Sequence, residues 1–184
     1  MMAFKPVSMA DSCSFVSTYD PAVDRARICE RTIEEHPEWR ESHFSEAQLR
    51  ELAWQTFTIN FAAKVGRDPA ESLRLLVFKD GETPTKFVLG ALSSEDFNRI
   101  IDETQETQVH RGAGNERLWR MFLHGLRGLE NFPGEVKMRK VGDLEYVDTA
   151  WLRRTFIRDL RTVACQVGMV IMHYNALTEE EIKN

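Results

Sequence analysis

The spacing of hydrophobic positions predicts a mainly helical chain. A first helix is expected to open at Asp20-Pro21 and to end near Glu35, before Pro37, because Asp is a good N-cap and Pro suits the first helical turn. The capping-box pattern Ser45-Glu-Ala-Gln48 opens a second helix that reaches about Val65. Three more helices are expected over about 95–108, 115–130 and 150–175.

The second helix carries a wide apolar set, which includes Leu52, Trp54, Phe57 and Ile59. A helix that is apolar on more than one side is buried on more than one side. We therefore expect it either to lie at the centre of the core or to be covered on its second side by a partner.

The hydrophobic period changes between residues 73 and 92. Two β-rich runs, 73–78 and 85–92, flank a polar turn that contains Asp80-Gly81, and this arrangement predicts a β-hairpin. A short strand is expected near 13–18, and residues 135–147 are expected to be irregular or weakly extended. The predicted fold class is mainly α (α+β), a single domain over 1–184 with about five helices and one small hairpin.

The composition indicates whether the chain can form a packed core and in which cellular compartment it is expected. The chain has 184 residues, of which 42% are hydrophobic and 29% charged, enough for a packed core without disulfides. Three cysteines without a paired spacing fit a reducing compartment. The chain shows no signal peptide and no apolar run long enough for a membrane span. We therefore expect a soluble cytoplasmic protein.

The net charge of −5 is unevenly placed. Residues 1–110 hold 12 Lys/Arg and 19 Asp/Glu, whereas residues 111–178 hold 11 and 7, which divides the domain into an acidic part (1–110) and a basic part (111–184). Such asymmetry steers partners or favours head-to-tail self-association. Ordinary variation among solvated faces is the alternative interpretation.

The sequence shows no motif for catalysis, metal or cofactor binding. It lacks zinc-protease, nucleophile-elbow and phosphate-loop patterns, so we expect no cofactor, no metal and no enzymatic activity. Cys165 stands in an apolar helical stretch, where burial is expected to keep its thiol inert. An enzyme with a site assembled from scattered Asp, Glu and His side chains remains an alternative.

Arginines recur at helical spacing in the basic part. The candidate partner-binding residues form two stripes, Arg117, Arg120 and Arg127 with His124 between them, and Arg154, Arg158 and Arg161. These arginines would suit contact with an acidic surface of a partner protein. The other interpretation is that the two stripes are solvated or paired with carboxylates of the same chain. A nucleic-acid-binding regulator is a further alternative, disfavoured by the sequence pI of about 5.6 and the lack of exposed aromatics between the arginines.

Three strings, which cover about a third of the chain, carry a family resemblance: Tyr19-Asp-Pro-Ala-Val-Asp24, Thr83-Pro-Thr-Lys-Phe-Val-Leu-Gly-Ala-Leu-Ser-Ser-Glu95, and the end of the chain from Gly168 to Asn184. Arg127-Gly128-Leu129, ahead of a Pro-containing loop, adds to them. In this order they resemble small proteins of tailed bacteriophages encoded among structural genes. Residues 25–66 depart from that pattern as a helical insertion.

The resemblance implies a non-enzymatic protein–protein interaction factor in virion or tail assembly, either a minor structural protein or an assembly chaperone. Its partners would be phage structural proteins or a second copy of itself. It would act in the cytoplasm of the bacterial host cell or in the virion, and the resemblance implies no catalytic residue.

Overall fold

The computed structural model describes residues 12–105, 113–157 and 160–181. It is mostly helical (58%), with seven α-helices and two small sheets in these ranges, so the mainly α class is confirmed and the expected five helices and single hairpin are only approximate. The helices are α1 (Arg25–Glu35), α2 (Glu46–Val65), α3 (Ser72–Leu75), α4 (Ser94–Gln105), α5 (Ala113–Gly125), α6 (Thr149–Thr155) and α7 (Arg161–Glu181), with the 3-10 turns η1 (Pro37–Glu41) and η2 (Pro69–Glu71). The strands are β1 (Ser12–Phe15), β2 (Lys86–Gly90), β3 (Leu126–Glu130), β4 (Met138–Val141) and β5 (Leu144–Val147).

The main sheet is antiparallel and has the order β1-β2-β3. Ser12 of β1 pairs with Gly90 of β2, and Lys86 at the other end of β2 pairs with Glu130 of β3. The predicted hairpin of 73–78 with 85–92 is therefore wrong: residues 72–75 form α3. Strand β2 is hydrogen-bonded on both edges by strands distant in sequence, so it has no need of a local partner.

A second sheet lies where irregular backbone was expected. Strands β4 and β5 form a hairpin in which Val141 pairs with Leu144. Its turn contains Gly142 at a φ of 61°, a left-handed conformation that glycine adopts without steric cost. Tyr146 and Val147 of β5 are buried.

One predicted helix ends earlier than the pattern indicated, and another is interrupted. The helix expected over 115–130 stops at Gly125 and the chain continues as β3. The helix expected over 150–175 is divided into α6 and α7. Between them, Phe156 is buried and its ring centroid lies 5.0 Å from that of Phe122 and 6.1 Å from that of Phe87. The break thus places an aromatic side chain in the core.

The first helix begins later than predicted, at Arg25, with Asp24 as its N-cap. Asp20 stabilises the preceding turn instead, because its carboxylate accepts hydrogen bonds from the backbone N–H of Ala22 and of Thr85, each at 2.9 Å. The predicted end before Pro37 is confirmed, as are the bounds and the capping box of α2.

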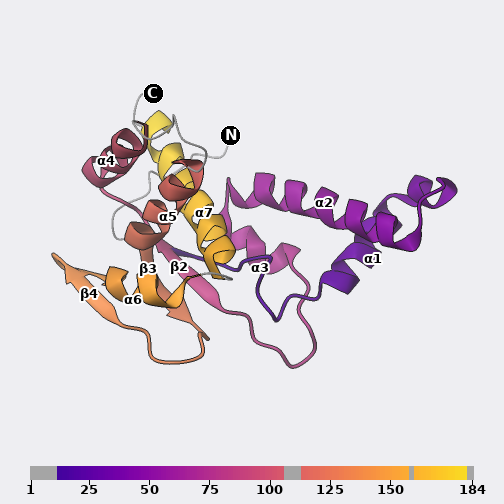
Figure 1. Cartoon of the computed structure of the whole chain (residues 1–184), viewed down its shortest axis with the longest axis horizontal. Helices are drawn as coiled ribbons and strands as arrows, with labels where there is room; N and C mark the ends of the chain where they lie inside the picture. Colours follow the sequence, from indigo (N-terminus) through magenta and orange to yellow (C-terminus); the bar gives the residue numbers. More distant parts are fainter. Residues whose placement is uncertain (1–11, 106–112, 158–159, 182–184) are drawn as a thin grey trace.

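One hydrophobic cluster joins the acidic and basic parts of the chain. It contains Phe15 and Phe57 from the first part and Phe122 and Phe156 from the second. Helices α5 and α7 pack against each other, and α7 also contacts β2 (Figure 1). In the ranges described, no helix combines the length and the apolarity that crossing a bilayer requires.

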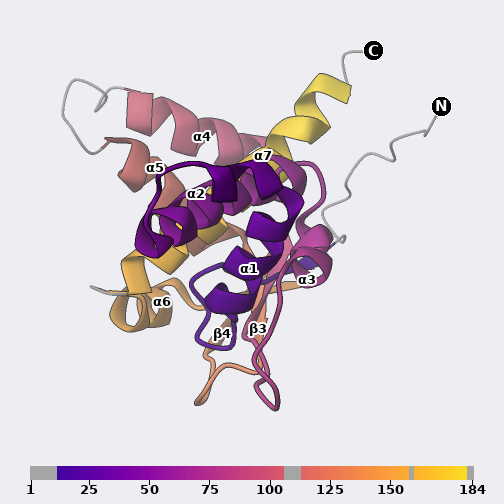
Figure 2. The same cartoon turned by 90° about the vertical axis from the view of Figure 1, so that its right-hand side faces the viewer.

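Helices α1 and α2, with η1 between them, form a helical hairpin that extends away from both sheets (Figure 1); we call residues 25–65 the arm. In Figure 2 the arm points toward the viewer, with α4 and the end of α7 on one side of it and the β3 and β4 strands on the other. Phe57, Phe61 and Val65 of α2 are buried in the core, whereas Ile59 is 70% exposed. The side of α2 that carries Ile59 is therefore exposed to solvent.

Candidate interaction surfaces

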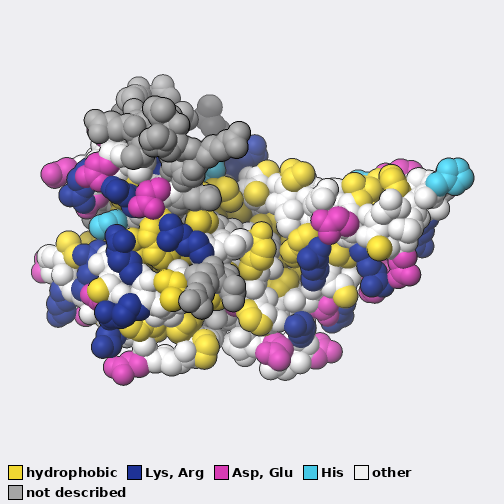
Figure 3. All heavy atoms as spheres, viewed as in Figure 1, with side chains coloured by type: hydrophobic (Ala, Val, Ile, Leu, Met, Phe, Trp, Pro, Cys, Tyr) yellow, Lys and Arg dark blue, Asp and Glu magenta, His cyan; other side chains and the backbone are white. Residues whose placement is uncertain are grey.

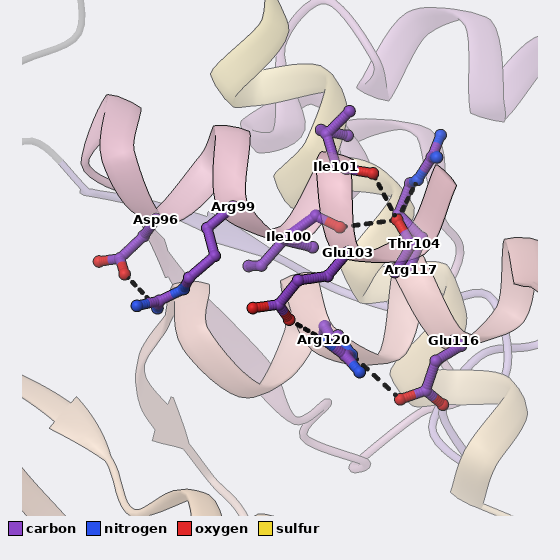
Figure 4. A network of polar contacts seen from close by, with 9 residues as sticks. All are labelled: Asp96, Arg99, Ile100, Ile101, Glu103, Thr104, Glu116, Arg117 and Arg120. Atoms are coloured by element: carbon purple, nitrogen blue, oxygen red, sulfur yellow. Dashed lines mark hydrogen bonds and ion pairs between the residues drawn. The ribbon is translucent and has the colours of Figure 1, made fainter. Parts of the chain in front are cut away.

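Two of the predicted contact arginines, both on α5, are used inside the molecule. The Nε of Arg117 donates a hydrogen bond to Oγ1 of Thr104 at 2.8 Å. Arg120 forms ion pairs with Glu103 of α4 and, at 3.3 Å, with Glu116 (Figure 4). The first arginine stripe therefore joins α5 to α4.

Arg161, the first residue of α7, has a similar internal role. Its guanidinium lies 3.6 Å from the carboxylate of Glu116 and 4.0 Å from the ring centroid of Trp119. A cation over an indole face is attracted by the ring quadrupole, so Arg161 holds the start of α7 against α5. Locally paired arginine faces, the alternative interpretation, thus account for Arg117, Arg120 and Arg161.

Arg127 does not continue the α5 stripe, because it lies on β3. Its guanidinium stacks 4.2 Å from the ring centroid of Tyr146. On its other side lies Gly90 of β2, where an added Cβ would stand 2.5 Å from Cγ and 2.9 Å from Cδ of Arg127. Only glycine leaves room for this side chain, so Gly90 and Tyr146 fix its position between the two sheets.

More cations gather near Tyr146. The guanidinium of Arg139 lies 5.7 Å from the Tyr146 ring centroid, and its Nε is buried without a hydrogen-bond partner among the described atoms. Burial lowers the pKa of His124, and the positive charges of Arg139, Arg99 and Arg153 lower it further, while Asp96 acts in the opposite direction. These side chains are therefore close enough to interact electrostatically.

We call His124, Arg127, Arg139 and Arg153, together with Arg154, which follows Arg153 in α6, the basic cluster. Arg153 and Arg154 are exposed at the end of α6. In the part of the chain that the structure describes, no ion pair involves Arg139, Arg153 or Arg154. Figure 3 shows Lys and Arg side chains gathered at the end of the molecule that α6 and the β4–β5 hairpin occupy. Of the second predicted stripe, Arg154 belongs to this cluster, and Arg158 lies outside the described residues.

An apolar cavity of about 240 Å³ opens beside the break between α6 and α7. Tyr19 and Leu160 on its rim are 54% and 40% exposed, and the adjacent Ile157 is 52% exposed. Arginine spacing did not indicate this cavity, although Tyr19-Asp20-Pro21 and Thr85 belong to the strings singled out in the sequence. Its apolar lining consists of Tyr19, Pro21, Phe87, Phe132, Pro133, Phe156, Leu160 and Val163.

The outer edge of the arm is acidic. Glu30 and Glu34 of α1 are exposed, stand one turn apart, and take part in no ion pair between described residues. They line a depression of about 300 Å³ that also contains the apolar Ile33 and Leu49. Arg40 and Arg50 border this depression as well, and Arg50 is paired with Glu46 at 2.7 Å.

The arginines of α1 form contacts with other elements of the chain. Arg25 pairs with Glu51 of α2 at 3.1 Å and Arg27 with Asp80 at 3.7 Å. Arg31 donates a hydrogen bond to the carbonyl oxygen of Leu75 at 2.9 Å. The cations of α1 are thus tied to the rest of the chain, whereas Glu30, Glu34 and Glu35 are exposed and form no ion pair between described residues.

Two of the three cysteines, Cys13 and Cys29, are set in surroundings that disfavour the reactive thiolate. Burial raises the pKa of the Cys13 thiol to about 12, helped by the negative charge of Asp68 and opposed by a hydrogen bond with Tyr174. Burial also raises the pKa of Cys29. Cys165, expected to be buried, is only partly so. Among the described residues, His, Cys, Asp and Glu side chains form no group of three suited to a metal ion.

Comparison with known proteins gives no assignment: no protein-family model, no curated protein and no solved structure matches the chain.

Proposed function

We propose that the protein is a non-enzymatic protein–protein interaction factor in bacteriophage virion or tail assembly, either a minor structural protein or an assembly chaperone. The observation that carries the interaction role is the projecting arm. Its helix α2 has apolar residues on two sides, and α1 together with the core covers only one of them. The phage context rests on the resemblance of Tyr19–Asp24, Thr83–Glu95 and the C-terminal string to phage structural-module proteins.

The arm presents large apolar side chains to solvent. Phe44, just before α2, is 48% exposed and Ile59 is 70% exposed. Exposed aromatic and aliphatic side chains become anchors when a partner desolvates them. The apolar cavity near Phe156 supplies a second place where an apolar side chain of a phage structural protein would fit.

The test is a pull-down of the tagged full chain from a native phage-producing lysate, with mass spectrometry and a graded salt wash. We expect tail or capsid proteins that resist moderate salt, because the anchors are apolar and salt screens only charges. The double variant Phe44→Asp, Ile59→Asp should lose them, whereas Asn60→Asp, which alters an exposed polar neighbour, should keep them. A monomer that recovers no phage structural protein would overturn the proposal.

A nucleic-acid-binding regulator is the second candidate, because Arg139 and Arg153 both act on His124 and neither they nor Arg154, the neighbour of Arg153, form ion pairs with described carboxylates. Phosphate contacts make binding steeply salt-dependent. Binding of a generic DNA or RNA duplex at low salt, lost in Arg153→Glu, Arg154→Glu, would favour this candidate. No binding at low salt would exclude it.

A further inference from the structure

We propose that the basic cluster of one copy binds the acidic edge of α1 in a second copy, so that the protein assembles with itself through its two charged ends. This inference rests on the proposed function and specifies one of its partners.

The receiving surface is the basic cluster. Tyr146 lies against the guanidinium groups of Arg127 at 4.2 Å and Arg139 at 5.7 Å, and Arg139 and Arg153 both act on His124. Arg139 and Arg153 take part in no ion pair between described residues, and the carboxylate of Asp96, which also acts on His124, is already paired with Arg99. An incoming carboxylate would give the guanidinium groups of Arg139 and Arg153 charge-assisted hydrogen bonds.

The incoming surface is the edge of α1 that carries Glu30 and Glu34. These residues are four apart on one helix face, a spacing at which like charges destabilise a helix. The apolar Ile33 and Leu49 lie beside them, so the aliphatic stems of arginine side chains from α6 could pack there while their guanidinium groups reach the carboxylates. Arg40 also borders this depression, so we expect the arginines of the second copy to contact only the side that carries Glu30 and Glu34.

The two surfaces cannot meet within one copy. The arm occupies one end of the longest axis of the molecule, and α6 with the β4–β5 hairpin occupies the other (Figure 1). A contact between them therefore joins different copies. It is heterologous, because the two copies use different surfaces, and it either closes a ring or extends into a chain.

A charge-exchange experiment on the full chain tests the contact by sedimentation velocity. At about 50 mM NaCl we expect the wild type to associate, and at about 300 mM NaCl we expect the association to weaken, since exposed charges are screened. Arg153→Glu, Arg154→Glu cancels the positive charge of the basic cluster, and Glu30→Lys, Glu34→Lys turns the acidic edge of α1 basic. Each variant alone should associate at least about tenfold more weakly than wild type.

An equimolar mixture of the two variants should recover association, because each supplies the end that the other needs. Arg67→Glu and Glu82→Lys reverse exposed charges away from both surfaces and should behave as wild type. Circular dichroism of every variant would show whether the fold is retained.

A wild type that stays monomeric at about 100 μM in low salt, or a mixture that stays monomeric while both variants are folded, would overturn the inference. The proposed function would survive that result if the pull-down still recovers phage structural proteins. It would fail separately if the chain associates with itself but recovers no phage protein.

Discussion

A Cβ atom added to Gly168 of α7 would lie 2.7 Å from the carbonyl carbon of Leu118 in α5. The backbones of the two helices therefore touch at this point, and Gly168 is required because it has no side chain. The contact lies between the two helices that pack most extensively on each other, and it sets how closely α7 approaches the rest of the core.

Replacing Gly168 with Ala should destabilise the protein strongly. The neighbouring atoms are backbone and cannot rotate away, so α7 has to shift, at a cost of about 1 to 3 kcal/mol or more. Thermal and urea unfolding followed by circular dichroism would measure the loss. Gly128→Ala is the control, since its Cβ would meet Val88 at an ordinary 3.7 Å; equal losses in both variants would contradict the close contact.

Gly90 and Arg127 should be energetically coupled. Gly90→Ala pushes the Arg127 side chain off the Tyr146 ring, and we expect a loss of about 1 to 2 kcal/mol. In an Arg127→Ala background the same substitution should cost much less, because the obstructing side chain has gone. A double-mutant cycle in urea measures the coupling, and additive losses would show that the two residues do not restrain each other.

The stability of the fold should depend on His124. Burial, then Arg139, lowers its pKa below the ordinary 6.5, so the folded protein prefers the neutral ring and the unfolded chain binds the proton more readily. The stabilisation is complete above about pH 6.5 and is lost as the pH falls through the lowered value. The melting temperature should drop less between pH 7 and pH 5 in His124→Gln than in wild type, with the exposed His43→Gln as control. An NMR titration that gives His124 a pKa above 6.5 would contradict this.

Cys13 should resist thiol reagents in the native protein. With its pKa raised to about 12, almost none of it is thiolate at pH 8, and the thiolate is the reactive form. Mass spectrometry after a short iodoacetamide pulse should find Cys13 far less modified than Cys165, with the difference removed in denaturant. Equal native labelling would show that the Cys13 site is open.

Local signals in the sequence predicted the arm well. The capping box at Ser45 and Gln48 and the stop before Pro37 depend only on neighbouring residues, and both are confirmed. The second apolar side of α2 was also recognised, although only the structure shows that it is open at Ile59.

The sheet was harder to predict because its partners are distant. Residues 85–92 were recognised as β-rich, but a hairpin assumes a neighbour in sequence, and the true partners are β1 and β3. Leu126 and Leu129 fit a helical period that continues α5, and pairing with β2 overrides it. In the same way, the long helical pattern after Thr149 does not show that Phe156 is drawn into the core.

For the candidate surfaces, too, the sequence predicted what neighbouring residues determine and missed what depends on distant ones. Helical spacing correctly placed Arg117 and Arg120 on one helix, but it could not show that carboxylates of α4 and α5 would form ion pairs with Arg120. Arg139 and Arg153 were not singled out, because Arg139 of β4 and Arg153 of α6 come close enough to His124 to lower its pKa only in three dimensions.

The order of the main sheet also shapes how the chain folds as it is synthesised. Ser12 cannot find Gly90 until about half of the 184 residues have been made, nor Lys86 find Glu130 until more than two thirds have, and such non-local pairing is slow. The arm is synthesised much earlier, before the later part of the core against which Phe57 and Phe61 pack has been made. During that interval the growing chain exposes aromatic surface, and this is when it is most prone to aggregate or to need a chaperone.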